Sequence, residues 1–122
     1  MATRYWVGGT GTWSAAGTTH WSATSGGSSG ASAPTSSDDV VFDALSGVGT
    51  ITITSASIAC KSLDSSTYLQ SFTLSGSGVL TIGNSSGGSL NIGAMVTLTT
   101  SSTNSFVFAS TISGNTSFSG VS

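Results

Sequence analysis

Residues 71–92 contain three short segments that repeat one pattern: Ser71-Phe72-Thr73-Leu74, Val79-Leu80-Thr81-Ile82 and Ser89-Leu90-Asn91-Ile92. In each segment, one hydroxyl or amide residue separates two apolar residues. Because successive side chains of a β-strand point to opposite faces, this spacing is typical of a strand with one face in a core and the other in water. The segments therefore predict three strands that are imperfect copies of one unit.

The same spacing recurs along the chain, at residues 51–53, 58–60, 96–98 and 106–108. Mixtures of Ser, Gly and Asn, which favour turns, separate the pairs. No stretch combines helical spacing with good helix formers, and the sequence contains no Glu. The sequence predicts an all-β fold.

Two architectures accommodate many short strands of this kind, a β-solenoid and a β-sandwich of the jelly-roll type. Each predicted strand offers only two or three inward residues, and the turns between strands are interchangeable. These features favour a short β-solenoid of β-helix type. No clean period survives the whole chain, so the sandwich remains the alternative.

The first 43 residues differ from the rest, because they hold all three tryptophans and several glycine clusters. We divide the chain into a Trp/Gly-rich cap or anchoring segment, residues 1–43, and a repetitive Ser/Thr/Gly body, residues 44–122, within one structural domain. The first turn of a solenoid exposes its core and its strand edges, and a cap covers them. The expected cap residues are Trp6, Trp13, Trp21, Val40 and Phe42.

Charged residues make up only 5% of the 122-residue chain, and its formal net charge is −2. Arg4 and Lys61 are the only cationic side chains apart from histidine, so few phosphates can be neutralised. This composition excludes nucleic-acid binding and attraction to an anionic membrane surface. No apolar run approaches the length of a membrane span, and we expect no membrane insertion.

The opening of the chain resembles a known group of proteins. Tyr5-Trp6-Val7-Gly8-Gly9-Thr10-Gly11-Thr12-Trp13, His20-Trp21-Ser22, Pro34 and Asp38-Asp39-Val40-Val41-Phe42-Asp43 are similar to the N-terminal segment of β-helix structural proteins of tailed bacteriophages. They resemble autotransporter-like adhesins more distantly. The resemblance covers about the first third of the chain, and the remainder matches only in composition.

This resemblance implies a non-enzymatic structural protein on the virion surface. Its role would be capsid decoration as a cement protein, or the anchoring of a tail fibre or spike. Its partners would be copies of itself and other virion proteins, such as the major capsid protein. The resemblance implies no activity and no cofactor.

Residues 116–122 continue the body's pattern and show no evident C-terminal cap. An uncovered solenoid end invites strand pairing by another chain. We therefore expect a homo-oligomer, most simply a homotrimer.

An alternative function follows from the tryptophans. Flat aromatic rings stack on sugar faces, so Trp6, Trp13 and Trp21 are candidates for glycan contact. Under this hypothesis the chain is a carbohydrate-binding adhesin or receptor-binding module that meets host surface glycans.

Asp38, Asp39 and Asp43 are the candidates for a calcium site, because carboxylates are ligands of that ion. A calcium loop usually spaces its ligands at alternate positions, whereas Asp38 and Asp39 are adjacent and would point to opposite faces of a strand. Hydrogen bonding to local backbone amides in a turn is the favoured role, and we predict no metal.

The sequence contains no set of residues typical of an active site. Asp64 could supply a second carboxylate across the fold, as a glycosidase requires. His20 is the only histidine and has no flanking triad signature. Cys60 alternates with apolar neighbours and is expected to be buried. We predict that the protein is not an enzyme.

Overall fold

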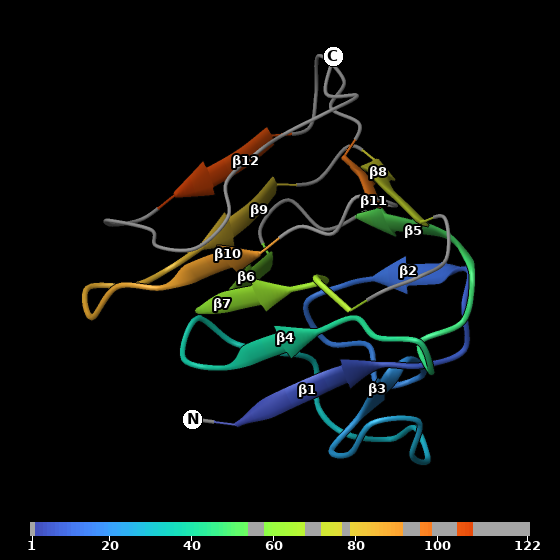
Figure 1. Ribbon diagram of the computed structural model, residues 1–122. Coiled ribbons are helices and arrows are strands. Elements are labelled where there is room, and N and C mark those ends of the chain that lie inside the picture. The colour runs from blue at the N-terminus through green and yellow to red at the C-terminus, as the bar shows by residue number, and fades with distance from the viewer. Residues whose placement is uncertain are drawn as a thin grey trace.

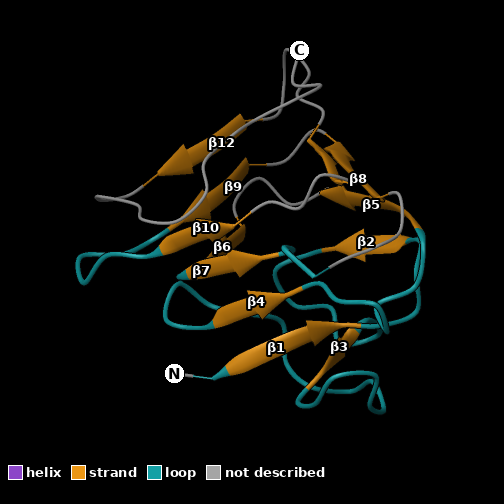
Figure 2. Ribbon diagram, viewed as in Figure 1, coloured by secondary structure: helices purple, strands orange, loops and turns teal. Residues whose placement is uncertain are grey.

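The computed structural model describes residues 2–53, 58–67, 72–76, 79–91, 96–98 and 105–108. Those residues contain twelve strands and no helix, as Figure 2 shows, so the all-β prediction is confirmed. With no helix in this part of the chain, none is long and apolar enough to cross a membrane. The expected pattern at residues 116–122, and Ile92, lie outside the described residues.

The strands are short and are separated by turns and loops. In chain order they are β1 (Thr3–Trp6), β2 (Gly11–Trp13), β3 (Trp21–Ser22), β4 (Asp39–Val41), β5 (Gly49–Ile53), β6 (Ile58–Cys60), β7 (Ser62–Asp64), β8 (Phe72–Gly76), β9 (Val79–Ile82), β10 (Ser89–Asn91), β11 (Val96–Leu98) and β12 (Ser105–Phe108).

The strands form three sheets, with the orders β10-β7-β4-β1-β3, β11-β8-β5-β2 and β12-β9-β6. From β4 onward, every strand except β6 pairs in parallel with the strand three places before it. Figure 1 shows β1, β4, β7 and β10 side by side along one flank. From β4 onward the chain thus visits the three sheets in turn, and each set of three successive strands adds one strand to each sheet.

The parallel register aligns the apolar residues of successive strands. Val40 pairs with Leu63, and Leu63 pairs with Leu90, and all three side chains are buried. A second set of rows joins β6 to β9, where Ile58 meets Leu80 and Cys60 meets Ile82. Each such aliphatic side chain removed from water contributes about 1.5–3 kcal/mol. The alternation seen in the sequence therefore becomes a core of stacked rows.

The N-terminal strands depart from this rule. The short strand β3 does not join the sheet of β6; it pairs antiparallel with β1, with Trp6 opposite Trp21. Within residues 1–43 the sequence predicts one short strand, Val40-Val41-Phe42 after Asp38-Asp39, and β4 lies there, whereas β1, β2 and β3 were not predicted. The buried rings of Trp6, Trp13 and Trp21 lie on these strands and form part of the core.

A close backbone approach joins the two predicted segments of the chain. The Gly9 amide donates to the Ser46 carbonyl oxygen at 2.9 Å. At Gly47, φ is +85°, and a Cβ atom there would lie 2.7 Å from the Gly9 nitrogen. Glycine is required at position 47 both by this φ value and by the lack of space.

Candidate functional site

Four aromatic side chains pack together at the N-terminal end of the core, and we call Trp6, Trp13, Trp21 and Phe42 the aromatic cluster. The Trp21 ring meets the Trp6 and Trp13 rings edge to face, each at 5.1 Å between centroids. Phe42 lies 6.0–6.5 Å from all three. These distances and tilted arrangements are those that aromatic pairs favour.

The burial of the aromatic cluster determines whether its rings can contact a ligand in this conformation. The three tryptophans are at most 1% exposed, and Val40 and Phe42 are equally buried. A sugar stacks on an exposed ring face, and none of these rings presents one. All five predicted cap residues thus belong to the core, whereas a contact of the cluster with a neighbouring subunit stays a prediction.

The indole N–H groups of the cluster differ. Trp6 Nε1 donates to the Gly9 carbonyl oxygen at 2.7 Å. Trp13 Nε1 is buried and has no hydrogen-bond partner among the described residues. A buried donor left without a partner costs about 1–3 kcal/mol, so Trp13 is held by packing alone.

His20 extends the cluster towards the surface. Its ring lies parallel to that of Trp6, with centroids 4.7 Å apart and an interplanar angle of 6°. Its Nδ1 atom lies 2.7 Å from the Val7 carbonyl oxygen. The ring also borders an open hollow of about 330 Å³ that is lined by Gly11, Thr12, Ser14, Gly17, Thr19, His20 and Trp21. His20 is the one titratable group among the residues that line this hollow, so the hollow does not bring together a catalytic set.

The three calcium candidates lie in three different environments. Asp38 is buried and accepts hydrogen bonds from the amides of Ala2 and Thr35 and from the Thr35 hydroxyl, at 2.8–3.0 Å. Burial raises the pKa of Asp38, but these hydrogen bonds outweigh it and hold the pKa below its ordinary value of 3.8. Asp38 thus ties the start of β1 to the turn before β4.

Asp43 also serves a turn, because its carboxylate accepts from the Leu45 amide at 2.9 Å and from the Ser25 hydroxyl at 2.6 Å. Asp39 lies on the outer face of β4, opposite to the buried Val40. In the part of the chain that the structure describes, no three Asp, Glu, His or Cys side chains gather to hold a metal. The structure therefore does not bring Asp38, Asp39 and Asp43 together.

Cys60 is fully buried in the row that it forms with Ile82. Burial, with a smaller contribution from the charge of Asp39, raises the pKa of its thiol to about 12. The group is therefore a neutral thiol at physiological pH and behaves as a small apolar side chain.

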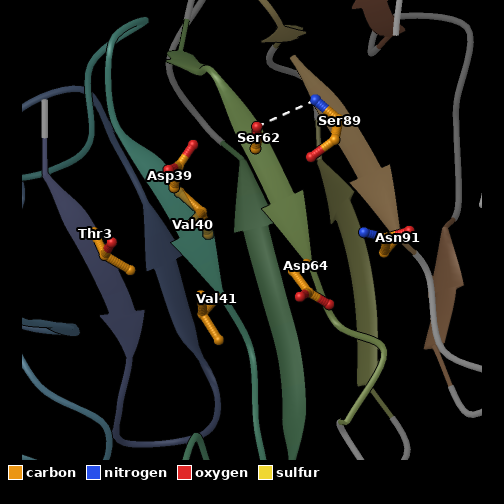
Figure 3. Close-up of a pocket in the computed structure, with 8 residues that line it drawn as sticks. All are labelled: Thr3, Asp39, Val40, Val41, Ser62, Asp64, Ser89 and Asn91. Carbon is orange, nitrogen blue, oxygen red and sulfur yellow. Dashed lines mark hydrogen bonds between the residues drawn. The ribbon is translucent and has the colours of Figure 1, made fainter. Parts of the chain in front are cut away.

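A hollow on the outer face of the largest sheet gathers polar side chains that sequence analysis mostly did not single out. It has a volume of about 260 Å³, it crosses β1, β4, β7 and β10, and we call it the outer groove (Figure 3). Its lining residues are Thr3, Asp39, Val40, Val41, Ser62, Asp64, Ser89 and Asn91.

The strand register arranges these residues in two rows. Pairing places Thr3, Asp39, Ser62 and Ser89 in one row. Two residues further along the strands, Val41, Asp64 and Asn91 form the other. Because the strand period is two, both rows project from the same face. Asp64, which the sequence offered as a second carboxylate across the fold, is here a diagonal neighbour of Asp39.

Some polar atoms of the outer groove form hydrogen bonds with other described residues, and others do not. The Ser89 amide donates to Ser62 Oγ at 3.1 Å, as Figure 3 shows. Asp64 Oδ1 accepts from the Ser66 amide and hydroxyl, at 2.9 and 2.6 Å. No described residue donates a hydrogen bond to the Asp39 carboxylate or to Asp64 Oδ2. Within the described part of the chain, these acceptor atoms of the groove therefore have no hydrogen-bond donor.

Only knowledge of the pairing could have revealed the outer groove. Thr3, Ser62 and Ser89 are ordinary hydroxyl residues far apart in the sequence, and they meet because β1, β4, β7 and β10 stack in register. Comparison with known proteins adds no assignment, because no protein-family model, curated protein or solved structure matches this chain.

Proposed function

We propose that the chain is a non-enzymatic structural protein of a tailed-phage particle, whose body is a short β-solenoid with an N-terminal Trp-rich cap. On the virion surface it would decorate and brace the capsid, or anchor a fibre or spike. The observation that carries the solenoid is the parallel pairing of strands three places apart in all three sheets, and the particle role rests on the resemblance of the N-terminal segment to phage β-helix proteins.

That pairing is the arrangement a solenoid requires, because each turn of the chain must add one strand to every sheet. A jelly roll is built from antiparallel strands. Among the named strands the one antiparallel pair is β1 with β3, at the N-terminal end. The pairing therefore favours the solenoid over the sandwich.

The aromatic cluster supports the cap. Its large side chains are buried, and β1 and β3, which carry Trp6 and Trp21, pair antiparallel with these two residues opposite each other. The cluster also coincides with the residues that resemble the opening of phage β-helix proteins.

The surroundings of the titratable groups support a non-enzymatic role. The Asp38 carboxylate accepts three hydrogen bonds from Ala2 and Thr35, and Cys60 is a buried neutral thiol. Asp39 and Asp64 share the outer groove, yet Figure 3 shows their carboxyl groups pointing away from each other. A glycosidase needs two carboxylates that converge on one bond.

The solenoid can be tested by crosslinking. Thr12 and Thr52 are in-register partners on neighbouring strands of one sheet. Parallel neighbours lie about 4.8 Å apart, within the range that a disulfide can span. We expect the double variant Thr12→Cys with Thr52→Cys to oxidise to an intrachain disulfide, whereas Thr12→Cys with Ala59→Cys, which lies in another sheet, should not. Equal crosslinking of both pairs would contradict the topology.

The particle role can be tested by quantitative mass spectrometry of purified virions that encode the chain. We expect a fixed stoichiometric ratio to the major capsid protein, and native mass spectrometry of the isolated protein should give a homo-oligomer, with a trimer as the first expectation. Absence of the chain from intact virions would contradict the particle role. A monomeric mass for the isolated protein would contradict only the prediction of a homo-oligomer.

A further inference from the structure

We propose that the outer groove binds a neutral oligosaccharide, laid across β1, β4, β7 and β10. The inference does not depend on a virion role, because it follows from the residues that line the hollow. It also moves the expected glycan contact from the buried tryptophans to the opposite, polar side of the sheet.

The hydrogen-bonding chemistry of the groove matches a sugar. Sugar hydroxyls both donate and accept, and the groove offers both partners. The Asp39 carboxylate and Asp64 Oδ2 are acceptors that no described residue uses. The hydroxyls of Thr3 and Ser89 can donate or accept. Carboxylates form stronger hydrogen bonds than neutral acceptors, so the two aspartates would fix the ligand's orientation.

Apolar surface lies next to these polar groups. Val41 is half-buried in the floor of the groove, where it can contact the C–H face of a sugar ring. Tyr5 pairs with Val41 in the register and shares the outward face with Thr3. Tyr5 is a half-buried residue next to the groove, and a sugar at the end of the row formed by Val41, Asp64 and Asn91 would lie beside it.

The dimensions favour a chain of sugars over a single one. Neighbouring strands lie about 4.8 Å apart, so the row from Thr3 to Ser89 extends roughly 14 Å over four strands. The register repeats hydroxyl or carboxylate groups at each step. A linear oligosaccharide can therefore make similar contacts on successive strands.

The charge of the groove decides between ligands. Two carboxylates and no cationic side chain line it, so phosphorylated, sulfated or carboxylated ligands would be repelled. The carboxyl groups of Asp39 and Asp64 also do not converge, as Figure 3 shows. A single calcium ion requires ligand oxygens that lie within about 2.6 Å of the ion. A neutral polyhydroxylated ligand remains.

An NMR titration of the isotopically labelled protein tests the proposal, with maltohexaose, cellohexaose and N-acetylchitohexaose as neutral probes and a galacturonic acid oligomer as the acidic one. We expect at least one neutral probe to shift amide resonances of β4, β7 and β10, and the acidic probe to shift none. Absence of any shift, or shifts confined to the aromatic cluster, would overturn the proposal.

Two isosteric variants sharpen the test. Asp39→Asn and Asp64→Asn remove one acceptor charge each, and the amide oxygen introduced by Asp64→Asn can still accept from Ser66. Each should weaken binding of the neutral probe roughly tenfold, the effect expected from losing a hydrogen bond to a charged group. Asp43→Asn removes the same charge in a turn outside the groove, and its affinity should equal that of the unmodified protein. Equal effects of all three variants, or calcium binding without sugar binding, would overturn the proposal.

Discussion

The strands from β4 onward and the three strands before them bury their inward residues in different ways. In the later part, Val40, Leu63 and Leu90 stack in register, because β7 pairs with β4 on one side and with β10 on the other. In the three strands before β4, the buried residues include Trp6, Trp13 and Trp21 instead. The repeating strands bury aliphatic residues of moderate size, whereas the strands before them bury large aromatic rings.

The largest effect should come from removing a ring of the aromatic cluster. Trp21 contacts Trp6, Trp13 and Phe42, so Trp21→Ala should lower the free energy of unfolding by about 3–5 kcal/mol. Urea denaturation followed by circular dichroism measures the loss. The matched change in the stacked rows is Leu63→Ala, for which we expect a loss of about 2–5 kcal/mol. If Trp21→Ala lowered the free energy of unfolding by much less than Leu63→Ala does, the central position of Trp21 in the core would be contradicted.

The contact between the two regions should be nearly as sensitive. Gly47→Ala places a Cβ atom against the Gly9 nitrogen at a φ of +85°, and should cost about 1–3 kcal/mol. Gly30 also has a positive φ, of +121°, but a Cβ there would meet nothing within 4 Å. Gly30→Ala therefore reports backbone strain without the clash. If thermal unfolding gives equal losses for both variants, the close approach at Gly47 contributes nothing.

Two further substitutions separate packing from hydrogen bonding within the cluster. Trp6→Phe loses the bond from Nε1 to the Gly9 oxygen, whereas Trp13→Phe removes a buried N–H that has no described partner. Both lose similar volume, so Trp6→Phe should cost about 1–2 kcal/mol more than Trp13→Phe. The comparison uses the same denaturation measurement, and a larger loss at Trp13 would contradict the assignment of its N–H as unpartnered.

The smallest effect concerns pH. The pKa of Asp38 is lower in the folded protein than the ordinary 3.8, so its ionised form stabilises the fold above about pH 3.8, and this contribution disappears as the pH falls through the folded pKa. The stability difference between the unmodified protein and Asp38→Asn should therefore shrink below pH 3.8. Thr35→Val retains the Thr35 amide bond and should weaken this pH dependence without abolishing it. A difference that stays constant down to pH 2 would contradict the role of Asp38.

The regular part of the fold followed from local alternation. Every predicted apolar pair from residue 51 to residue 108 falls in a described strand, except that Ile92 lies outside the described residues. The strand β7 was missed because it carries one inward apolar residue, Leu63, too few to show a period. Ser75 and Gly76 were expected in a turn, yet they extend β8 because Thr52 and Ile53 supply backbone partners. Pairing overrides the turn preference of a single residue.

The sequence by itself determined the all-β class, the burial of Cys60 and the separation of an aromatic first part from a Ser/Thr/Gly remainder, because these depend on composition and on the two-residue period of a strand. Only the tertiary structure decided that the tryptophans lie inside, that β3 turns back on β1, and that Asp39, Ser62 and Ser89 share one groove. Strand register and sheet order depend on contacts between residues at least fifteen positions apart, and no local pattern specifies them.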